Sequence, residues 1–251
     1  MEKMGIINLT PDSFYAPSRV DGAGALRSRM EDLLSRGCSI LDLGAVSTRP
    51  GAEDVSEEEE WARLQPALRP AAEMADQIGH DGRHSRPRPG ISVDTTRASI
   101  VRKVYAEIGP FIVNDISAGE DDPSMLETVA ELGLPYIAMH KRGNPRSMDA
   151  LTDYPEGVTA AVLHYFEDFS EKAERLGIRD WILDPGFGFA KTSEQNWTLL
   201  RDLPRFKVFG VPVLAGVADK RFTKDPLFNG GDPSKAERLA VEGGADILRI
   251  H

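Results

Sequence analysis

The stretch ISVDTTRASIVRKVYAEIGPFIVND, residues 91–115, contains the pattern that decides the fold. Two short apolar runs end on the polar residues Asp94 and Asn114, and helix-like sequence lies between them. Similar runs occur along the whole chain, and they read MGIIN, SILDL, ISVD, FIVND, PYIAM, WILD, VPVLAG and DILRI. Continuous apolar runs that alternate with helical sequence predict a parallel sheet whose strands are buried on both faces.

This layout predicts an α/β fold, a parallel (β/α)₈ TIM barrel, in which the ends of all the strands meet at one rim. The rim is therefore expected to carry the function. The runs end at Asn8, Asp42, Asp94, Asn114, His140, Asp184, a turn leading to Lys220, and Arg249 with His251.

The helix that would follow the eighth strand of such a barrel is absent from the sequence, because the chain stops at His251 directly after the last run. A barrel strand without a covering helix would expose an apolar face, which soluble domains rarely tolerate. We therefore expect these residues to be the ordered part of a longer polypeptide.

Length and composition indicate a single domain over residues 1–251, since 251 residues with 41% hydrophobic content can bury one large core. The 40 acidic and 30 basic residues give a formal charge of −10, which disfavours binding to nucleic acid or to an anionic membrane. The single cysteine, Cys38, cannot form an internal disulfide. No run approaches the ~20 apolar residues of a membrane span. These features predict a cytoplasmic protein.

Three turns after strands carry candidate chemistry. NLTPDSF, residues 8–14, begins with Asn8, whose amide oxygen suits a hard cation such as Mg²⁺ or else caps the loop. DLGAVSTRPGA, residues 42–52, offers Ser47, Thr48 and Arg49 to an oxyanion, although an exposed loop with one arginine is the alternative. In DPGFGFAKT, residues 184–192, a proline fixes Asp184 and glycines permit close approach of a flat ligand.

Seven motifs, in the same order and over essentially the whole chain, resemble the dihydropteroate synthase family. They are GIINLTPDSF from Gly5, STRPG from Ser47, ISVDT from Ile91, IVNDIS from Ile112, the pair Met139 and His140, DPGFGFAKT from Asp184, and ADILRIH from Ala245. The resemblance implies a transferase of folate biosynthesis that is a target of sulfonamides. Its reaction would join 6-hydroxymethyl-7,8-dihydropterin diphosphate to p-aminobenzoate, giving 7,8-dihydropteroate and pyrophosphate. A homodimer is also implied.

The resemblance assigns the pterin to Asp94, Asn114 and Asp184. A buried carboxylate must be paired or hydrogen-bonded, and an aminopterin offers it two parallel N–H donors. Met139 would pack against the ring face, and Lys220 would contact both substrates. Read without the resemblance, Asp94 could instead cap a helix and Met139 could be core filler.

The remaining assignments concern the diphosphate and the aminobenzoate. Arg249 and His251 match the diphosphate-binding pair of the family, and residues two apart on a strand do share a face. Asn8 matches its magnesium ligand and would also lie near the diphosphate, as would Arg49. The aminobenzoate is expected to contact loops that close over it, at Phe14, Thr48, Arg49, Pro50, Lys220 and Arg221.

The implied mechanism requires anions near the pterin methylene and cations near the leaving diphosphate. We therefore expect Asp94, Asp184, Lys220 and Arg249 to be catalytic. An aromatic amine is already a neutral nucleophile, so no strong general base is required.

The seventh turn departs from the family, which usually has SRKS where this chain has ADKR at residues 218–221. Arg221 stands where a small hydroxyl residue normally helps to seat the aminobenzoate carboxylate, so we expect a reshaped subsite. Two alternatives remain open. One is a catalytically silent pterin-binding protein, and the other is a pterin-dependent methyltransferase with a corrinoid partner, which would not need STRPG, Lys220 or the Arg249 and His251 pair.

Overall fold

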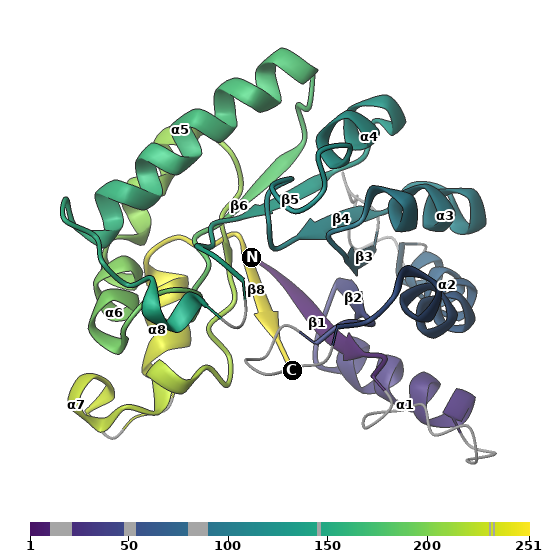
Figure 1. The fold of residues 1–251 in the computed structure, drawn as a ribbon. Helices are drawn as coiled ribbons and strands as arrows, with labels where there is room; N and C mark the ends of the chain where they lie inside the picture. The colour runs from purple at the N-terminus through teal and green to yellow at the C-terminus, as the bar shows by residue number, and fades with distance from the viewer. Residues whose placement is uncertain (11–21, 48–53, 80–89, 145–146, 231, 233) are drawn as a thin grey trace.

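The computed structural model describes residues 1–10, 22–47, 54–79, 90–144, 147–230, 232 and 234–251. Eight parallel strands form one sheet in the order β6-β5-β4-β3-β2-β1-β8-β7. Helices lie around the outside of the strands (Figure 1). The bounds of the strands are β1 Glu2–Asn8, β2 Ile40–Gly44, β3 Ile91–Asp94, β4 Ile112–Asp115, β5 Tyr136–Met139, β6 Trp181–Asp184, β7 Leu214–Ala215 and β8 Ile247–Ile250. The sheet closes between β6 and β7, where Leu183 forms a parallel bridge with Val213 and donates its N–H to the carbonyl of Pro212 at 2.9 Å. The predicted TIM barrel is confirmed.

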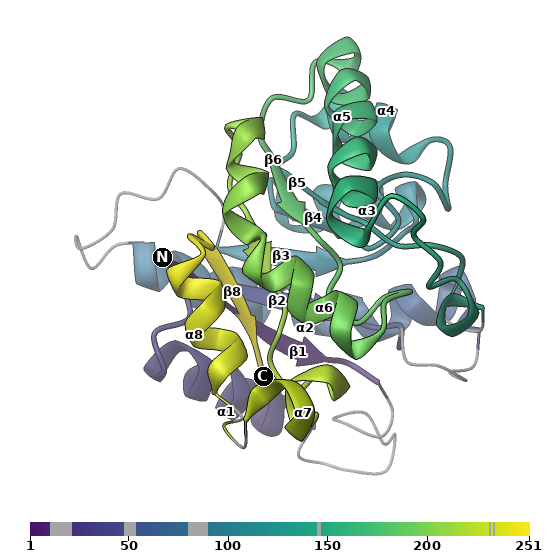
Figure 2. The ribbon, with the colours of Figure 1, turned by 90° about the vertical axis from the view of Figure 1, so that its left-hand side faces the viewer.

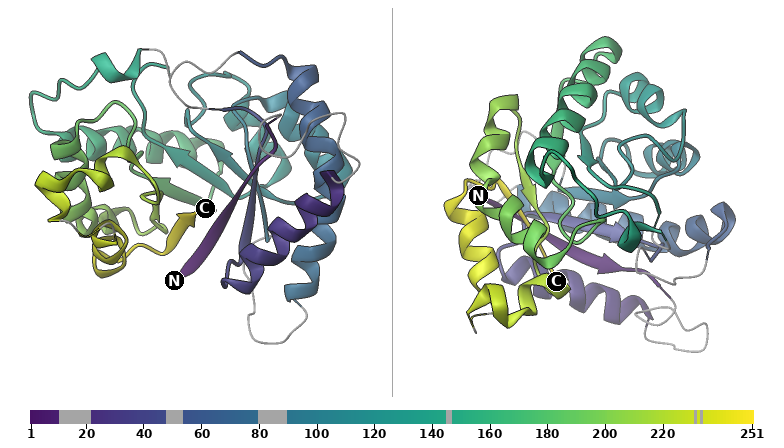
Figure 3. Two further views of the ribbon diagram at one scale, coloured as in Figure 1. Left: turned by 90° about the horizontal axis from the view of Figure 1, so that it is seen from below. Right: turned by 60° about the vertical axis from the view of Figure 1, so that its left-hand side comes forward.

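Helices surround the strands (Figure 3). Along the chain they are α1 Gly22–Ser35, α2 Glu57–Gly79, α3 Ala98–Ile108, α4 Met125–Leu132, α5 Val158–Leu176, α6 Ser193–Arg201, α7 Pro226–Asn229 and α8 Lys235–Glu242. Short 3₁₀ helices are η1 Met148–Ala150, η2 Leu203–Phe209 and η3 Arg221–Lys224. Helices α6 and α8 pack side by side (Figure 2). Among the described residues, no helix has both the length and the apolar character that crossing a bilayer requires.

Two apolar layers hold the barrel together, and the strand period of two separates them. One set of buried side chains fills the barrel interior and consists of Met4, Ile40, Ile112, Ile137, Ile182, Leu214 and Ile247. Residues at the alternate positions of the strands, such as Leu41, Val93 and Leu183, join the larger core between the strands and the helices. A strand residue that lies two or four positions after an interior residue therefore also faces the barrel interior.

Local signals in the sequence set several boundaries. Ser56 Oγ accepts the N–H of Glu59 at 3.2 Å, which caps the start of α2 as the capping-box spacing predicts. Helix α5 ends at Gly177, which has a φ of 76°. The run VPVLAG predicts a longer seventh strand than the structure has. Its start departs from regular pairing because the N–H of Val213 is taken by Oδ2 of Asp246 at 2.7 Å.

Candidate active site

Polar side chains from several strands enter the C-terminal end of the barrel, which we call the barrel mouth. Asp42, Asp94 and Asn114 each lie two residues after an interior position of their strand, as do Asp184 and Arg249. The strand register places Asp94 beside Asn114 and, on the next strands, Met139 beside Asp184. These polar side chains thus share the interior face of the barrel, toward its C-terminal end.

Arg249 is the centre of an ion-pair cluster at this end of the barrel. Its Nε donates to Oδ2 of Asp42 at 2.8 Å, and its Nη2 lies 2.6 Å from the same oxygen. Nη2 also donates to Oδ2 of Asp94 at 2.9 Å. Burial acts to lower the pKa of Arg249, but the two carboxylates outweigh it and raise the pKa. Arg249 is therefore a permanent cation in the barrel mouth.

The carboxyl group of Asp94 is close to its titration point at neutral pH. Burial raises its pKa to about 7, against the opposing effect of Arg249. Gly44, on the neighbouring strand, lies directly beside it, since a Cβ at that position would be in ordinary van der Waals contact with the Cβ of Asp94, at 3.5 Å. The contact with Arg249 uses Oδ2 of Asp94. A ligand with N–H donors would stabilise the ionised form.

The loop after β6 holds Asp184 by a tight turn. Oδ1 of Asp184 accepts the N–H of Gly186 at 2.8 Å, and burial raises the pKa of this carboxyl group. Gly186 has a φ of 71°, and a Cβ there would lie 1.9 Å from the backbone oxygen of His140. Glycine is therefore required at this position for both conformational and steric reasons.

Lys191, which follows in the same loop, stabilises it by hydrogen bonds. Its buried Nζ lies 2.9 Å from the carbonyl oxygen of Gly186, 3.0 Å from that of Phe189, and 3.0 Å from Nδ1 of His140. Burial lowers the pKa of Lys191 to about 7. The amine thus crosslinks the residues that follow β5 and β6.

Lys220 faces the same mouth as Asp184. Its Nζ lies 4.7 Å from the centroid of the Phe189 ring, and its side chain passes Gly188, where a Cβ would lie 3.2 Å from Cδ of Lys220. Burial and, to a smaller extent, Arg249 lower the pKa of Lys220 to about 8, against the opposing effect of Asp184. The lysine and the carboxylate therefore interact across a common space.

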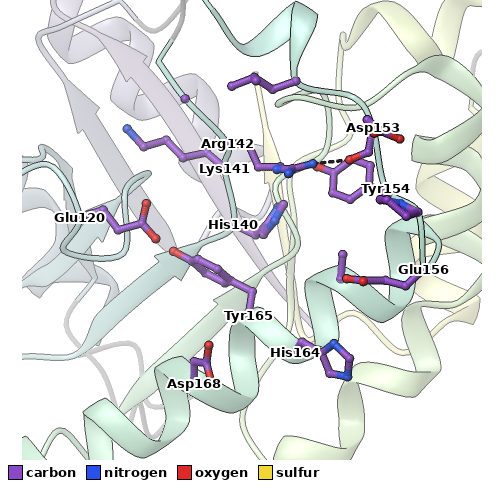
Figure 4. A pocket seen from close by; sticks show the side chains of 14 residues that line it. Glu120, His140, Lys141, Arg142, Asp153, Tyr154, Glu156, His164, Tyr165 and Asp168 are labelled. Carbon is purple, nitrogen blue, oxygen red and sulfur yellow. Dashed lines mark hydrogen bonds between the residues drawn. The ribbon is translucent and has the colours of Figure 1, made fainter.

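A separate cavity of about 610 Å³ lies outside the barrel wall, between the residues after β5 and helix α5 (Figure 4). Arg142 borders it, stacks 4.8 Å from the ring centroid of Tyr154, and donates to the carbonyl of Asp153 at 2.5 Å. His140 also lines it and packs edge-on against Tyr165, with 4.9 Å between the ring centroids. Within the described part of the chain, no inward-facing strand residue lines this cavity, so it is not the barrel mouth.

Comparison with known proteins identifies the family of this barrel. A family model described as pterin binding enzyme matches residues 4–251. The dihydropteroate synthase of Synechocystis sp. is 38% identical over 259 residues, which cover 99% of this chain and 84% of that protein. The chain belongs to the dihydropteroate synthase family.

Solved structures of dihydropteroate synthases agree with this assignment. The Yersinia pestis enzyme with a sulfonamide drug complex has a TM-score of 0.80 at 31% identity, covering 100% of this chain and 88% of that one. The Xanthomonas albilineans enzyme with 4-aminobenzoic acid has a TM-score of 0.78 at 33% identity, with coverages of 100% and 87%. The folic acid synthesis protein of Pneumocystis carinii is longer, and the chain matches 33% of its length at 36% identity. This dihydropteroate synthase homologue is a transferase of folate synthesis, and the matches do not favour the silent or methyltransferase alternatives.

The structure brings Asp94, Asn114 and Asp184 together with Lys220 and Arg249, as the motifs of the dihydropteroate synthase family lead one to expect. Other predicted residues lie around them. Met139 is buried in a cluster with Phe189, and Asn8 is half-buried at the end of β1. His251 lies directly after β8 with much of its surface exposed, and partial desolvation of its ring lowers its pKa.

The predicted aminobenzoate contacts are less well placed. Arg221 is 82% exposed, and its guanidinium lies 3.4 Å from a carboxylate oxygen of Asp149 in η1. Its role in the aminobenzoate subsite stays a prediction. The remaining predicted contacts lie outside the described residues, and they are Phe14, Thr48, Arg49 and Pro50.

Two residues of the site received no role from the sequence. Asp42 is recognisable only as the polar residue in the second apolar run, and Lys191 only as part of DPGFGFAKT. Both are charged residues inside apolar or glycine-rich stretches, where a charge requires a partner. That signal was available, but it does not identify the partner.

Proposed function

We propose that the barrel mouth condenses dihydropterin methyl diphosphate with p-aminobenzoate through the predicted residues. The supporting observation is the juxtaposition of acids and bases at the C-terminal end of the barrel, where Arg249 contacts Asp94 at 2.9 Å and Asp184 raises the pKa of Lys220 electrostatically. A heterocycle with N–H donors suits Asp94 and Asp184, and a diphosphate suits Arg249 and Lys220.

The charge arrangement accounts for the chemistry. Cleavage of the carbon–oxygen bond leaves positive charge on the pterin methylene and negative charge on the departing pyrophosphate. Asp94 and Asp184 stabilise the first charge, while Arg249, with His251 and Arg49, stabilises the second. The amine of p-aminobenzoate then forms the new carbon–nitrogen bond and loses a proton to solvent. Lys220 contacts both substrates and holds them in the orientation that the reaction needs, which lowers the entropic cost of bringing the amine to the methylene carbon.

A Mg²⁺ ion fits this proposal at Asn8. Within the described residues, no three His, Cys, Asp or Glu side chains are grouped to hold a metal. Mg²⁺, however, commonly binds through one or two protein oxygens, water and substrate phosphates, and an amide oxygen at a strand end can supply one ligand. When bound, the ion would neutralise charge on the leaving diphosphate. Calorimetric titration of Mg²⁺ with pyrophosphate present should give weaker binding for Asn8→Ala than for wild type, and equal binding would exclude Asn8 as a ligand.

We further propose that residues 1–251 act as one pterin-binding domain in a cytoplasmic homodimer. Support for the dimer comes from exposed apolar side chains on η2, α7 and α8, namely Val208, Leu227 and Val241, which are 76%, 86% and 45% exposed. Light scattering of the purified protein should give twice the mass of 27.5 kDa, and a monomer mass would reject the dimer. Cell fractionation would test the location.

The function is tested by pyrophosphate release after mixing the protein with dihydropterin diphosphate, with and without p-aminobenzoate. Release that depends on p-aminobenzoate is expected. Lys220→Ala and Asp184→Asn should each lower kcat/KM by about 100-fold or more. Lys224→Ala is the matched control, because Lys224 is 64% exposed and lies on the same turn. Near-wild-type rates in either active-site variant would contradict these roles.

A further inference from the structure

Asp42 is a charged side chain in the barrel mouth that none of the roles above uses. It lies in the middle of β2, with no exposed surface, and it faces the interior two residues after Ile40. Burying a carboxylate without partners would cost many kcal/mol of solvation, so its contacts must repay that cost. These contacts are with two residues that we propose to bind opposite ends of the substrate.

The first contact is with Arg249, the proposed diphosphate ligand. Oδ2 of Asp42 accepts a hydrogen bond from Nε of Arg249 at 2.8 Å and lies 2.6 Å from its Nη2. One edge of the planar guanidinium is therefore fixed against β2. Among the described residues, the contacts of Arg249 use Nε and Nη2, which leaves Nη1 available to an anion.

The second contact is with Asn114, a proposed pterin ligand. Nδ2 of Asn114 lies 3.2 Å from Oδ2 and 3.4 Å from Oδ1 of Asp42. An ionised carboxylate only accepts hydrogen bonds, so it selects the amide orientation in which the NH₂ group points at β2. The carbonyl oxygen of Asn114 is then directed away from Asp42, and it can accept an N–H from the heterocycle.

We propose that Asp42 is a positioning residue that orients Arg249 toward the diphosphate and the Asn114 carbonyl toward the pterin. The inference deepens the proposed function and rests on it. One carboxylate then sets the geometry at both ends of the same substrate, and its loss affects both ends together. A residue with a purely structural role would lower stability without weakening these two contacts selectively.

The decisive variant is Asp42→Asn, which keeps the size of the side chain and removes its charge. Binding of inorganic pyrophosphate and of 6-hydroxymethylpterin is measured separately by calorimetry, together with steady-state kinetics. We expect each affinity to fall about tenfold to a hundredfold, and the KM for dihydropterin diphosphate to rise similarly. The KM for p-aminobenzoate should change by less than about threefold, because no described contact links Asp42 to the predicted aminobenzoate residues.

Asp115→Asn is the matched control. Asp115 is equally buried, but it faces away from the mouth, and it accepts hydrogen bonds from Ser117, Gly119 and the Tyr136 hydroxyl. It should lower the melting temperature while both affinities stay within about threefold of wild type. Equal losses of affinity in the two variants would overturn the proposal.

Asp42→Glu decides the matter if Asp42→Asn does not fold, because it keeps the charge that Arg249 needs. Pyrophosphate binding should be retained, and pterin binding should weaken because the longer side chain displaces the Asn114 amide. Loss of pyrophosphate binding alone would refute the assignment. If the wild-type protein binds both ligands but does not turn over, the proposed function fails while the role of Asp42 is still decided by the binding data.

Discussion

Substitution of Gly186 tests whether the loop after β6 is held as tightly as its geometry indicates. In Gly186→Ala the new Cβ would lie 1.9 Å from the backbone oxygen of His140 and 3.4 Å from Nζ of Lys191. The matched control is Gly177→Ala, because Gly177 has nearly the same φ, 76° against 71°, and nothing lies within 4 Å of its Cβ. The difference between the two variants therefore isolates the steric overlap from the backbone strain.

The magnitudes follow from these contacts. A left-handed φ costs alanine about 1 kcal/mol in both variants. Only Gly186→Ala must also displace backbone, which costs roughly 1–3 kcal/mol, and it weakens the bonds of Lys191 and Asp184 to this turn, for roughly 1–2 kcal/mol more. We expect Gly186→Ala to be about 2–5 kcal/mol less stable than Gly177→Ala.

Urea unfolding followed by circular dichroism measures both variants, and the KM for dihydropterin diphosphate reports the position of Asp184. Gly186→Ala should raise that KM, and Gly177→Ala should leave it unchanged. The reasoning is refuted if the two variants differ by less than about 1 kcal/mol, since the overlap would then be relieved without cost.

Four further predictions concern the charged residues. Lys191→Met should destabilise the fold by about 2–5 kcal/mol, because two buried carbonyls lose their donor, and an unchanged urea midpoint would contradict this. The kcat/KM should rise through pH about 7 as Asp94 ionises and fall above about 8 as Lys220 loses its proton, and a flat profile would exclude these groups. The pKa of Lys220 falls from 10.5 to about 8 on folding, so its contribution to stability should rise with pH across that window and be absent in Lys220→Met. Arg221→Ser should change the inhibition constant of a sulfonamide but not the KM for dihydropterin diphosphate, and an unchanged inhibition constant would remove Arg221 from the subsite.

The period of two in the strands explains why the sequence predicts the convergence of the site. Once Asp94 and Asp184 are placed at the ends of parallel strands, barrel closure brings them to the same rim. The turns behave differently, because their geometry depends on contacts that the local sequence does not encode. The seventh strand is shorter in the structure than the run VPVLAG predicts, because Asp246, 33 residues away, accepts the N–H of Val213.

The roles of Asp42 and Lys191 depend on distant partners. Asp42 contacts Arg249 across 207 residues of sequence, and Lys191 reaches His140 across 51 residues. A charged residue in an apolar run signals that some partner exists, but the partner is fixed only when the barrel closes. Burial also moves the pKa values of Asp94 and Lys220 to about 7 and about 8, a consequence of packing that no spacing rule anticipates.

The sharing of Arg249 between two carboxylates bears on product release. The chain carries a formal charge of −10, so affinity for a diphosphate has to come from local cations. On the proposed assignments, Arg249 is partly neutralised while Asp94 accepts its hydrogen bond, and it should then bind free pyrophosphate less strongly. N–H donors of a bound pterin compete for Asp94 and leave Arg249 freer to hold the attached diphosphate. On the proposed assignments, bond cleavage separates the pterin from the diphosphate. Asp94 can then hydrogen-bond to Arg249 again, which weakens the hold of Arg249 on the released pyrophosphate.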